Sequence, residues 1–325
     1  MKAWILSSQT QGDWASSSTE VLYRSAKRLS IDVEIVRPEH LHFVFSHEEK
    51  SLYRHGQLVP ISDYPDVVLP RFGWNSLEQG LRACEMLENL FSLKVVNRSQ
   101  SIVLCSDKLK QLLVFAKEKI PIVKTHWASP TLNSGFHFTA MDSKEYVIKT
   151  VKGSQGYGVT FHPDIFSARA QVDCLRTLEA DFISQSFVKT PEPVHDLRIF
   201  MVAGQPVAAM KRFAVDGEFR SNLHQGGNAE KIELEDLPPE LVQISIQCCK
   251  ALKLGYGAVD FIQNNSLPTP LLNDFGDGGY VMYRYALSDG TPRLLVPIDG
   301  RTNVVPDSIF KKHQQAFRGL TNWRE

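Results

Sequence analysis

Short apolar runs alternate with amphipathic stretches over the first hundred residues of the chain. Apolar residues recur at helical spacing from Ser18 or Thr19 to Leu29, and again over residues 77–91. Strand-like apolar runs occupy residues 3–6, 33–36, 67–70 and 94–97. This alternation is typical of a parallel sheet covered by helices, so the pattern predicts a small doubly wound domain. No GxGxxG follows the first run, and no dinucleotide site is expected there.

The pattern changes after this segment. A helix is predicted from Ser106, whose hydroxyl can accept a backbone N–H of the first turn, to about residue 119, because Pro121 follows. Two later helices are expected over residues 167–178 and 239–254. A turn at Gly204 predicts a hairpin. The predicted strands occupy residues 146–149, 159–161, 182–184, 197–202, 206–210, 258–262 and 271–275.

Composition and charge narrow the class of protein. The 325 residues are 43% hydrophobic and 22% charged, as in an ordinary soluble protein with a sizeable core. Lys and Arg balance Asp and Glu at 36 each, so overall charge does not indicate a nucleic acid or membrane partner. The five cysteines lie in apolar helical patterns without zinc-type spacing, and we expect reduced core thiols. No segment resembles a signal peptide or a membrane span, so a cytoplasmic location is expected.

A glycine-rich stretch is the first candidate for chemistry. Lys149 ends a predicted strand, and Gly153, Gly156 and Gly158 lead into the next one. Glycines let the backbone approach a polyphosphate, and a lysine supplies the compensating charge. The stretch is not a Walker A loop, because GK[ST] is missing. Taken alone, a hairpin with a flexible glycine turn explains it equally well.

Acidic residues at two strand ends are the second candidate. Asp260 and Asp274 lie in successive predicted strands, and Asp277 follows just beyond. Adjacent antiparallel strands could place the first two on one face, where their repulsion is costly without a cation. Mg²⁺ takes hard oxygen ligands and bridges carboxylates to ATP phosphates. For any one of these acids, a solvated turn residue is the alternative.

A third candidate is the loop over residues 216–227. Arg220 is followed by two hydrogen-bonding side chains, Ser221 and Asn222, among glycines, and the segment is preceded by Lys211 and Arg212. Such a loop suits an anionic substrate or a developing negative charge. His224 is a candidate general base, and a solvated surface loop is the alternative.

Taken in order, these motifs resemble the ATP-grasp superfamily, and within it the RimK-type amino-acid ligases, which attach glutamate to a protein or small-molecule carboxylate. The resemblance extends over nearly the whole chain, and the run FRSNLH is its most specific part. It rests on Asp107 and Lys108, the run KGSQGYGV after Lys149, Gln185, Asp196 with Arg198, residues 218–224, residues 257–260 and residues 272–274, together with residues 69–73 and 84–87.

The resemblance implies a fold of the α/β and α+β class. It comprises an N-terminal Rossmann-like domain over residues 1–100, a central lid unit over residues 101–185 and a C-terminal unit with the metal site over residues 186–325. It also implies that phosphoryl transfer from ATP activates a carboxylate, and that an amine attacks the acyl phosphate to form an amide. Mg²⁺, or Mn²⁺, would be the metal. A protein or peptide acceptor and a dimer or tetramer are further possibilities that the resemblance leaves open.

Site residues follow from the same resemblance. It implies nucleotide binding by Lys108, Lys149, Gly153, Ser154, Gln155, Gly156, Gly158, Gln185, Ser186, Phe187 and Asp196, with Asp196 near the ribose. Arg220, Ser221 and Asn222 would lie at the phosphate and substrate end. Catalytic roles fall to Arg220, Lys211 and Arg198, and metal binding to Asp260, Asp274, Asn273 and Asp277.

The chain departs from the family pattern at two places. Ser186 and Phe187 stand where the family has Glu and Tyr, and Asp274 with Gly276 stands where the family has Glu-x-Asn. Asp274 would then be a shorter second metal ligand than the Glu of the family, and Gly276 lacks the amide of the family's Asn. Two alternatives to a ligase therefore stay open: a nucleotide-binding or regulatory protein without turnover, and a phosphotransferase that stops at phosphorylation. The sequence does not identify either substrate.

Overall fold

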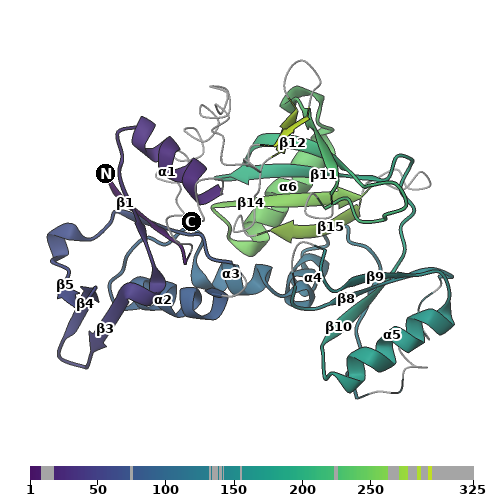
Figure 1. Ribbon diagram of the computed structural model, residues 1–325, viewed down its shortest axis with the longest axis horizontal. Helices are drawn as coiled ribbons and strands as arrows, with labels where there is room; N and C mark the ends of the chain where they lie inside the picture. The colour runs from purple at the N-terminus through teal and green to yellow at the C-terminus, as the bar shows by residue number, and fades with distance from the viewer. Residues whose placement is uncertain are drawn as a thin grey trace.

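Three sheets and the helices packed on them form the body of the protein (Figure 1). The computed structural model describes residues 1–8, 18–73, 76–131, 133, 138, 141, 143–153, 156–222, 226–262, 271–276, 284–286 and 292–294. The N-terminal sheet lies at the left of Figure 1, a five-stranded sheet at the upper right and a four-stranded sheet at the lower right. Helices α3 and α4 run between them.

The N-terminal sheet is parallel, with strand order β2-β1-β6. Its strands are β1 (Lys2–Leu6), β2 (Asp32–Val36) and β6 (Val67–Pro70), and helices α1 (Ser18–Arg28) and α2 (Leu77–Asn89) accompany them. Both faces are buried, because Ala3 and Ile5 pack in one cluster while Trp4 and Leu6 pack in another. The predicted strands and helices are confirmed, except that residues 94–97 form only an isolated bridge between Val95 and Val68.

A small antiparallel sheet that the pattern did not predict lies in the same part of the chain. It comprises β3 (Leu41–Phe45), β4 (Lys50–Arg54) and β5 (Gln57–Leu58), in that order. Short 3₁₀ turns at Pro38–His40 and Ile61–Asp63 flank it. Most of its side chains are exposed or half-buried, so its apolar periodicity is weak in the sequence.

The helix predicted from Ser106 to about residue 119 is confirmed as α4, and a short helix that was not predicted, α3, precedes it. Helix α3 spans Ser99–Cys105 and α4 spans Lys108–Lys117. The capping residue of α4 is Asp107, whose Oδ1 accepts the N–H of Lys110 at 2.9 Å. Ser106 instead donates its hydroxyl to the carbonyl of Val103, so the prediction of Ser106 as the cap was wrong. A carboxylate accepts a backbone N–H at least as well as a hydroxyl does, and it lies one residue nearer the helix.

The four-stranded sheet has the order β7-β10-β8-β9 and is antiparallel throughout. Its strands are β7 (Thr125–His126), β8 (Tyr146–Thr150), β9 (Val159–His162) and β10 (Phe182–Ser186). Helix α5 (Ile165–Thr177) covers one face, where Val172 packs in a cluster with Ile148 and Phe182. The predicted strands and helix are confirmed here, and the glycine-rich stretch joins β8 to β9.

The five-stranded sheet has the order β13-β12-β11-β14-β15. It is formed by β11 (His195–Val202), β12 (Gln205–Phe213), β13 (Asn228–Ile232), β14 (Tyr256–Ile262) and β15 (Leu271–Gly276). Helix α6 (Pro239–Leu252) packs on it, and a short 3₁₀ turn, Leu234–Asp236, precedes the helix. The predicted hairpin at Gly204 is confirmed, whereas β13 was not predicted. A further pair, β16 (Arg284–Ala286) with β17 (Pro292–Leu294), completes the strands described.

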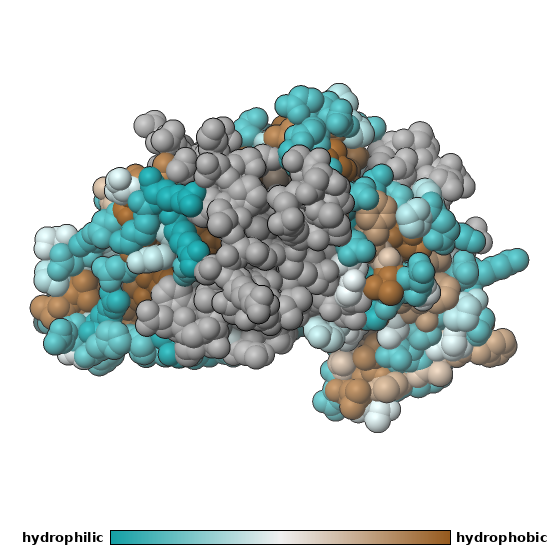
Figure 2. Space-filling model, turned by 45° about the horizontal axis from the view of Figure 1, so that its top comes forward, coloured by the Kyte–Doolittle hydropathy of each residue, from teal (hydrophilic) through white to brown (hydrophobic). Residues whose placement is uncertain are grey.

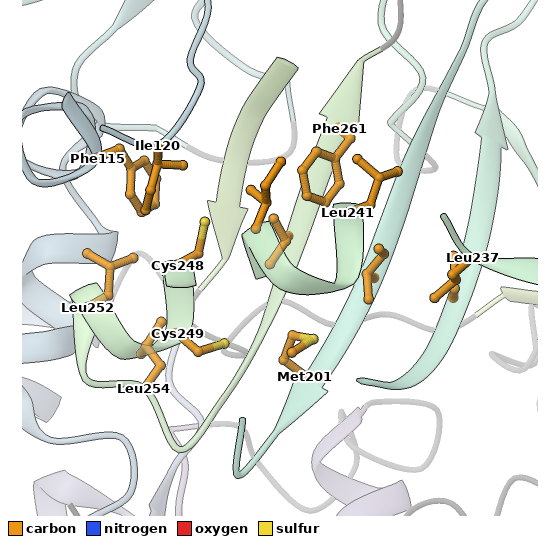
Figure 3. Packing of buried hydrophobic residues seen from close by; sticks show 14 residues of the cluster. Phe115, Ile120, Met201, Leu237, Leu241, Cys248, Cys249, Leu252, Leu254 and Phe261 are labelled. Carbon is orange, nitrogen blue, oxygen red and sulfur yellow. The ribbon is translucent and has the colours of Figure 1, made fainter. Parts of the chain in front are cut away.

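One core joins α4 to the five-stranded sheet. Figure 3 shows Phe115 and Ile120, from the α4 segment, beside Cys248 and Leu252 of α6, and all four belong to one buried cluster with Phe261. Helix α4, which begins the expected central unit, therefore packs with the expected C-terminal unit. This contact places the end of α4 in the core that also contains Phe261 of β14.

The cysteines are only partly the core thiols that were expected. Cys84, Cys248 and Cys249 are buried, whereas Cys105 is half-buried and Cys174 is exposed, and none of the five forms a disulfide. Burial raises the pKa of Cys249 to about 12, so that thiol is protonated and unreactive at neutral pH. Among the described residues, no helix has the length and apolar character needed to cross a membrane.

Exposed apolar side chains gather at the two ends of the molecule. Figure 2 shows brown surface at the far left and at the lower right. The exposed apolar residues include Phe45 and Ile61 in the N-terminal part, and Phe166 and Leu178 at the ends of α5.

Candidate functional site

A buried network of arginine and aspartate side chains spans three neighbouring strands of the five-stranded sheet. Asp196 on β11 lies opposite Arg212 on β12, and Arg198 on β11 lies opposite Asp260 on β14. Arg198 donates to both oxygens of Asp260, each at 2.6 Å. Arg212 donates from Nε to Asp196 Oδ1 at 2.7 Å and from Nη2 to Asp260 Oδ2 at 2.9 Å. The two acids and two bases alternate, so the network is neutral.

Burial makes this neutrality necessary. Asp196, Arg212 and Asp260 are each 4% exposed or less. Burial alone would raise the pKa of the Asp260 carboxyl, but the charges of Arg198 and Arg212, with their hydrogen bonds, outweigh it and lower that pKa. Burial likewise opposes the charge of Arg212, and the two carboxylates outweigh it and raise the pKa of the guanidinium. The Asp260 carboxylate and the Arg212 guanidinium are therefore both ionised at neutral pH.

The pairing of Asp260 with Asp274 was predicted from the sequence and is confirmed for the backbone, where the two residues are direct partners across β14 and β15. The sequence argument assigned the compensating positive charge to Mg²⁺. In the structure, arginines already supply it at Asp260. The side chains of Asp274 and Asn273, and the whole of Asp277, lie outside the described residues. Within the described part of the chain, no cluster of three or more His, Cys, Asp or Glu residues could hold a metal.

Lys108 and Lys149 lie at the start of the glycine-rich loop. The amide of Lys108 donates to Val151 O at 3.1 Å, which places the first turn of α4 against the end of β8. Its ammonium donates to Thr150 O at 3.2 Å and to Gly153 O at 2.9 Å. Lys149 is on β8 and 9% exposed. The structure thus brings both predicted phosphate-binding lysines to one loop, whose Ser154 and Gln155 lie outside the described residues.

Gly156 and Gly158 give the loop a conformation that other residues adopt poorly. Their φ angles are +81° and +71°. A Cβ on Gly158 would lie 2.2 Å from Thr150 Oγ1, and a Cβ on Gly156 would lie 3.0 Å from Asn222 Oδ1. The loop is therefore packed against β8 on one side and against the loop of Arg220 on the other. Thr150, which the sequence analysis passed over, determines how closely the loop can fold.

Arg220 connects the glycine-rich loop to its own loop. Its Nη1 donates to Gly156 O at 3.0 Å, while Glu218 accepts from its Nε at 3.0 Å and from its Nη2 at 2.7 Å. The hydrogen bond from Arg220 lowers the pKa of Glu218 despite partial burial, so the pair is ionised at neutral pH. Glu218 fixes the direction of the guanidinium. Ser221, the next residue, is 8% exposed.

The remaining predicted residues are placed as follows. Gln185 donates from Nε2 to Thr125 Oγ1 at 2.7 Å, and Ser186 ends β10. Lys211 is on β12, where its backbone lies opposite Leu197 and Glu230. His224 lies outside the described residues. Asp196, expected near a ribose, is held by Arg212, and its role toward a nucleotide stays a prediction.

Three aromatic rings bring together segments from the two sheets. Phe187, just after β10, lies 4.6 Å from Phe161 of β9, and Phe219 lies 5.8 Å from Phe161 and 6.4 Å from Phe187, measured between ring centroids. Phe219 directly precedes Arg220. The position of the catalytic candidate is therefore coupled to both strands of the four-stranded sheet. Only the adjacency of Phe219 and Arg220 was visible in the sequence.

The segment that carries these residues matches a known protein family. The model of the RimK-like ATP-grasp domain matches residues 105–271, which include Lys108, the glycine-rich loop, Arg220 and Asp260. This chain belongs to the RimK-like ATP-grasp family. A probable alpha-L-glutamate ligase from Haemophilus influenzae is 31% identical over 256 residues, covering 76% of this chain and 82% of the relative. The corresponding protein from Picosynechococcus is 29% identical over 252 residues, covering 77% and 81%.

Solved structures of ATP-grasp ligases share the fold. D-cycloserine synthetase DcsG aligns with a TM-score of 0.63 at 15% identity, covering 97% of this chain and 99% of that one. D-alanine–D-alanine ligase from Bacillus anthracis complexed with ATP aligns at 0.60 and 15% identity, covering 85% and 86%. The ligase PsnB with a precursor variant, Mg and ADP aligns at 0.60 and 13% identity, covering 95% and 98%. This member of the RimK-like family is an ATP-dependent carboxylate–amine ligase.

Proposed function

We propose that this ligase joins the amino group of glutamate, or of a similar amino acid, to a carboxylate of an acceptor through an acyl phosphate. The names of its relatives support glutamate as the amine. The observation that carries the proposal is Arg220, whose guanidinium is aimed by Glu218 and held at the carbonyl of Gly156. A fixed positive charge at the glycine-rich loop suits a phosphoryl group in transfer.

The reaction consists of two balanced steps. An acceptor carboxylate oxygen attacks the γ-phosphorus of ATP, the bond to the bridging oxygen breaks, and ADP leaves. The amine then attacks the carbonyl carbon of the acyl phosphate, the C–N bond forms, phosphate leaves and the nitrogen loses a proton. Because both steps involve negatively charged oxygens, catalysis is mainly positioning and neutralisation of charge. Lys108 and Lys149 would hold the phosphates, and Arg220 would stabilise the transferred group, with Arg198, Lys211 and Ser221 around it.

The metal-binding role belongs to the end of β14 and β15. Asp260 and Asp274, which are backbone partners, supply carboxylates, and hard oxygen ligands of this kind suit Mg²⁺ or Mn²⁺. Asn273 and Asp277 could complete the set. A bound cation would neutralise phosphate charge there. Since Arg198 and Arg212 already bind Asp260, the cation would share that carboxylate with them.

We also propose the division into functional units at residues 1–100, 101–185 and 186–325. The four-stranded sheet would act as the lid, and Gln185, Ser186 and Phe187 would form the hinge segment beside the adenine. A peptide or protein acceptor, a homo-oligomer and a cytoplasmic location belong to the same proposal. The structure of PsnB with a minimal precursor supports the peptide acceptor by analogy of fold.

One assay tests the proposal. Purified protein with Mg·ATP, glutamate and a panel of carboxylic acids and peptides is followed for ADP release, and the products are weighed by mass spectrometry. One ADP for each acceptor that gains a glutamyl residue is the expected result. ATP binding by calorimetry without ADP release from any acceptor would favour the nucleotide-binding alternative. A stable phosphorylated acceptor without an amide would favour the phosphotransferase.

A further inference from the structure

The small antiparallel sheet of the N-terminal part has one long open edge. Among the described residues, β3 (Leu41–Phe45) pairs with β4 on one side only, and the opposite edge of the sheet is formed by β5, which is two residues long. Strand β3 contains no Pro, Lys, Arg, Asp or Glu, and its pairing with β4 has no bulge. Natural sheets protect an edge with such features, so this edge is suited to pairing with another strand.

Two backbone hydrogen bonds show which residues of β3 direct their backbone groups outward. The amide of His55 donates to His40 O at 3.1 Å, and the amide of Ser46 donates to Glu49 O at 2.8 Å. In an antiparallel pair, residues that bond to the partner strand alternate with residues that do not. The even-numbered positions from 40 to 46 therefore bond to β4, and the three odd-numbered residues of β3 direct their backbone groups to the open edge.

The side chains of these three residues are apolar. Phe45 is 53% exposed, while Leu41 and Phe43 are half-buried and pack on the core of the N-terminal sheet. On the other face of β3, Val44 is 37% exposed. The brown surface at the far left of Figure 2 lies over this part of the molecule, where Figure 1 places β3 to β5. The edge therefore combines outward backbone groups with exposed apolar side chains.

The sequence of β3 is suited to pairing with a second copy of itself. A two-fold antiparallel arrangement centred on Phe43 places this residue opposite its counterpart. Leu41 then lies opposite Phe45 of the other copy, and His42 lies opposite Val44. Apolar side chains meet on the face of Phe43, and no two charges of the same sign stand opposite each other along the strand.

The charges at the two ends of β3 complement each other in this arrangement. The turn that follows β3 carries Glu48 and Glu49, both exposed, and the segment that precedes β3 carries Arg37 and His40. Antiparallel pairing brings the turn of one copy beside the preceding segment of the other copy, and the two-fold axis repeats this contact. Complementary charges of this kind favour the correct partner and register.

The preceding segment has a positive environment. Burial lowers the pKa of His40, and the charges of His55, Arg37 and Arg54 lower it further, whereas Glu39 acts in the opposite direction. The rings of His40 and His55 lie 4.1 Å apart between centroids. An acidic turn is therefore attracted to this end of β3, and this chain itself supplies such a turn at the other end.

We propose that β3 of one copy pairs antiparallel with β3 of a second copy, so that two three-stranded sheets form one sheet of six strands. This inference rests on the homo-oligomer of the proposed function and specifies its contact surface. The surface lies at the opposite end of the molecule from the four-stranded sheet (Figure 1), so pairing leaves that sheet clear in both copies. Because the edge is short, we expect a dimer that dissociates on dilution, with a Kd of about 10 µM.

The molar mass in solution is the first test. Light scattering of the unmodified protein should give the mass of one chain at about 1 µM and of two chains at about 100 µM. Phe45→Lys places a charge on the edge and should raise the Kd at least about 10-fold. Leu58→Lys is the matched control, because Leu58 is 58% exposed on β5 at the other edge of the same sheet, and it should leave the Kd unchanged.

Three results of this measurement would overturn the proposal. The first is the mass of one chain for the unmodified protein at about 100 µM. The second is an oligomer that Phe45→Lys leaves intact, which would place the contact elsewhere. The third is an equal weakening by Leu58→Lys, which would indicate general apolar association instead of pairing at β3.

A disulfide tests the register. The exposed Cys174 and the half-buried Cys105 are first replaced by Ser. Proteins with His42→Cys and with Val44→Cys are then mixed and oxidised. In the proposed register these two positions face each other with a Cα–Cα distance of about 4.5 Å, within the range that a disulfide spans. The mixture should give a cross-linked dimer.

Each cysteine protein oxidised alone is the control for the register. Like positions of the two copies lie about 8 Å apart between Cα atoms, too far for a disulfide. Efficient cross-linking of either protein alone, or none in the mixture, would contradict the register centred on Phe43.

ADP release separates this proposal from the ligase function. The variants Phe45→Lys and Leu58→Lys are followed in the assay described above. Loss of the dimer with ADP release intact would support the surface and leave the ligase standing. Absence of ADP release from every form would count against the ligase, while the mass and disulfide results would still decide the surface.

Discussion

Arg212 Nη2 donates to Asp260 Oδ2 at 2.9 Å, and the same guanidinium holds Asp196 through Nε at 2.7 Å. The side chain of Arg212 on β12 therefore fixes one carboxylate on each of two other strands, Asp196 on β11 and Asp260 on β14. Asp260 is the acid placed at the metal end of the proposed active site. The orientation of that carboxylate thus depends on a residue that touches neither phosphate nor metal in the proposal.

Removing Arg212 should be strongly destabilising. Arg212→Ala leaves Asp196 without its buried partner and Asp260 with one arginine instead of two. Breaking a buried ion pair from one side costs about 3–5 kcal/mol, and we expect the free energy of unfolding to fall by that amount in urea denaturation. Arg82→Ala on the surface of α2 should change it by less than about 0.5 kcal/mol. A loss below about 1 kcal/mol for Arg212→Ala would show that the network is dispensable.

The network should also make stability depend on pH. The pKa of Asp260 is lowered in the folded protein, so its ionised form contributes stability above the unfolded pKa of about 4. That contribution is lost as the pH falls through the lower, folded pKa. The difference in unfolding free energy between the unmodified protein and D260N should therefore shrink between about pH 5 and pH 3. A difference that stayed constant or grew on acidification would contradict the assignment.

Magnesium should bind only together with the nucleotide. Since Arg198 and Arg212 neutralise Asp196 and Asp260, the protein offers little net negative charge to a dication at this end of β14. Calorimetry of Mg²⁺ alone should show no binding tighter than about 1 mM, whereas Mg²⁺ added with a non-hydrolysable ATP analogue should bind. EDTA should then stop ADP release. Submillimolar Mg²⁺ binding to the nucleotide-free protein would argue against a shared Asp260.

The glycine-rich loop should not tolerate a methyl group at Gly158. A Cβ added at Gly158 would lie 2.2 Å from Thr150 Oγ1, whereas a Cβ added at Gly204 would have no atom of the described residues within 4 Å of it beyond its chain neighbours. The φ angles of the two glycines are similar, at +71° and +74°. Comparing Gly158→Ala with Gly204→Ala therefore separates the contact from the shared backbone strain. We expect Gly158→Ala to raise the KM for ATP at least about 10-fold and Gly204→Ala to leave it unchanged. Equal effects of the two substitutions would refute the contact argument.

Arg220 should act on the reacting groups rather than on nucleotide affinity. Arg220→Ala is expected to lower kcat by a factor of about 100 or more while the Kd for ATP, measured by calorimetry, changes little. Glu218→Gln weakens the two bonds that aim the guanidinium and should lower kcat by about 10-fold. If Arg220→Ala weakened ATP binding as much as turnover, the residue would belong to the nucleotide site instead.

How far the site could be predicted depended on strand register. The turn at Gly204 was visible in the sequence, and continuing its pairing without interruption would place Lys211 opposite Asp196. A bulge between Phe200 and Met201 shifts the register by one residue, so Arg212 lies opposite Asp196 instead. Nothing in the local pattern marks that bulge. The central role of Arg212 was therefore missed, although the residue stands in the quoted motif.

Buried elements were predicted better than exposed ones. The strands of the parallel N-terminal sheet are buried on both faces and appear as continuous apolar runs, as in Val67–Pro70. Strands β3 to β5 are largely exposed, so no alternation marks them in the sequence. Contacts between distant segments, such as Tyr256 with Pro70, have no sequence signal at all. The motifs therefore indicated the segments of the proposed reacting end, whereas contacts of this kind required the structure.

The most direct test of the proposed mechanism follows one oxygen atom. An acceptor whose reacting carboxylate carries ¹⁸O at both oxygens is incubated with enzyme, Mg·ATP and glutamate, and the products are analysed by mass spectrometry. An acyl phosphate requires that each amide formed transfers one ¹⁸O to inorganic phosphate, with ADP as the nucleotide product. Inorganic phosphate without ¹⁸O would contradict an acyl phosphate. AMP that carries the ¹⁸O would also contradict it, because that is the product expected from an acyl adenylate.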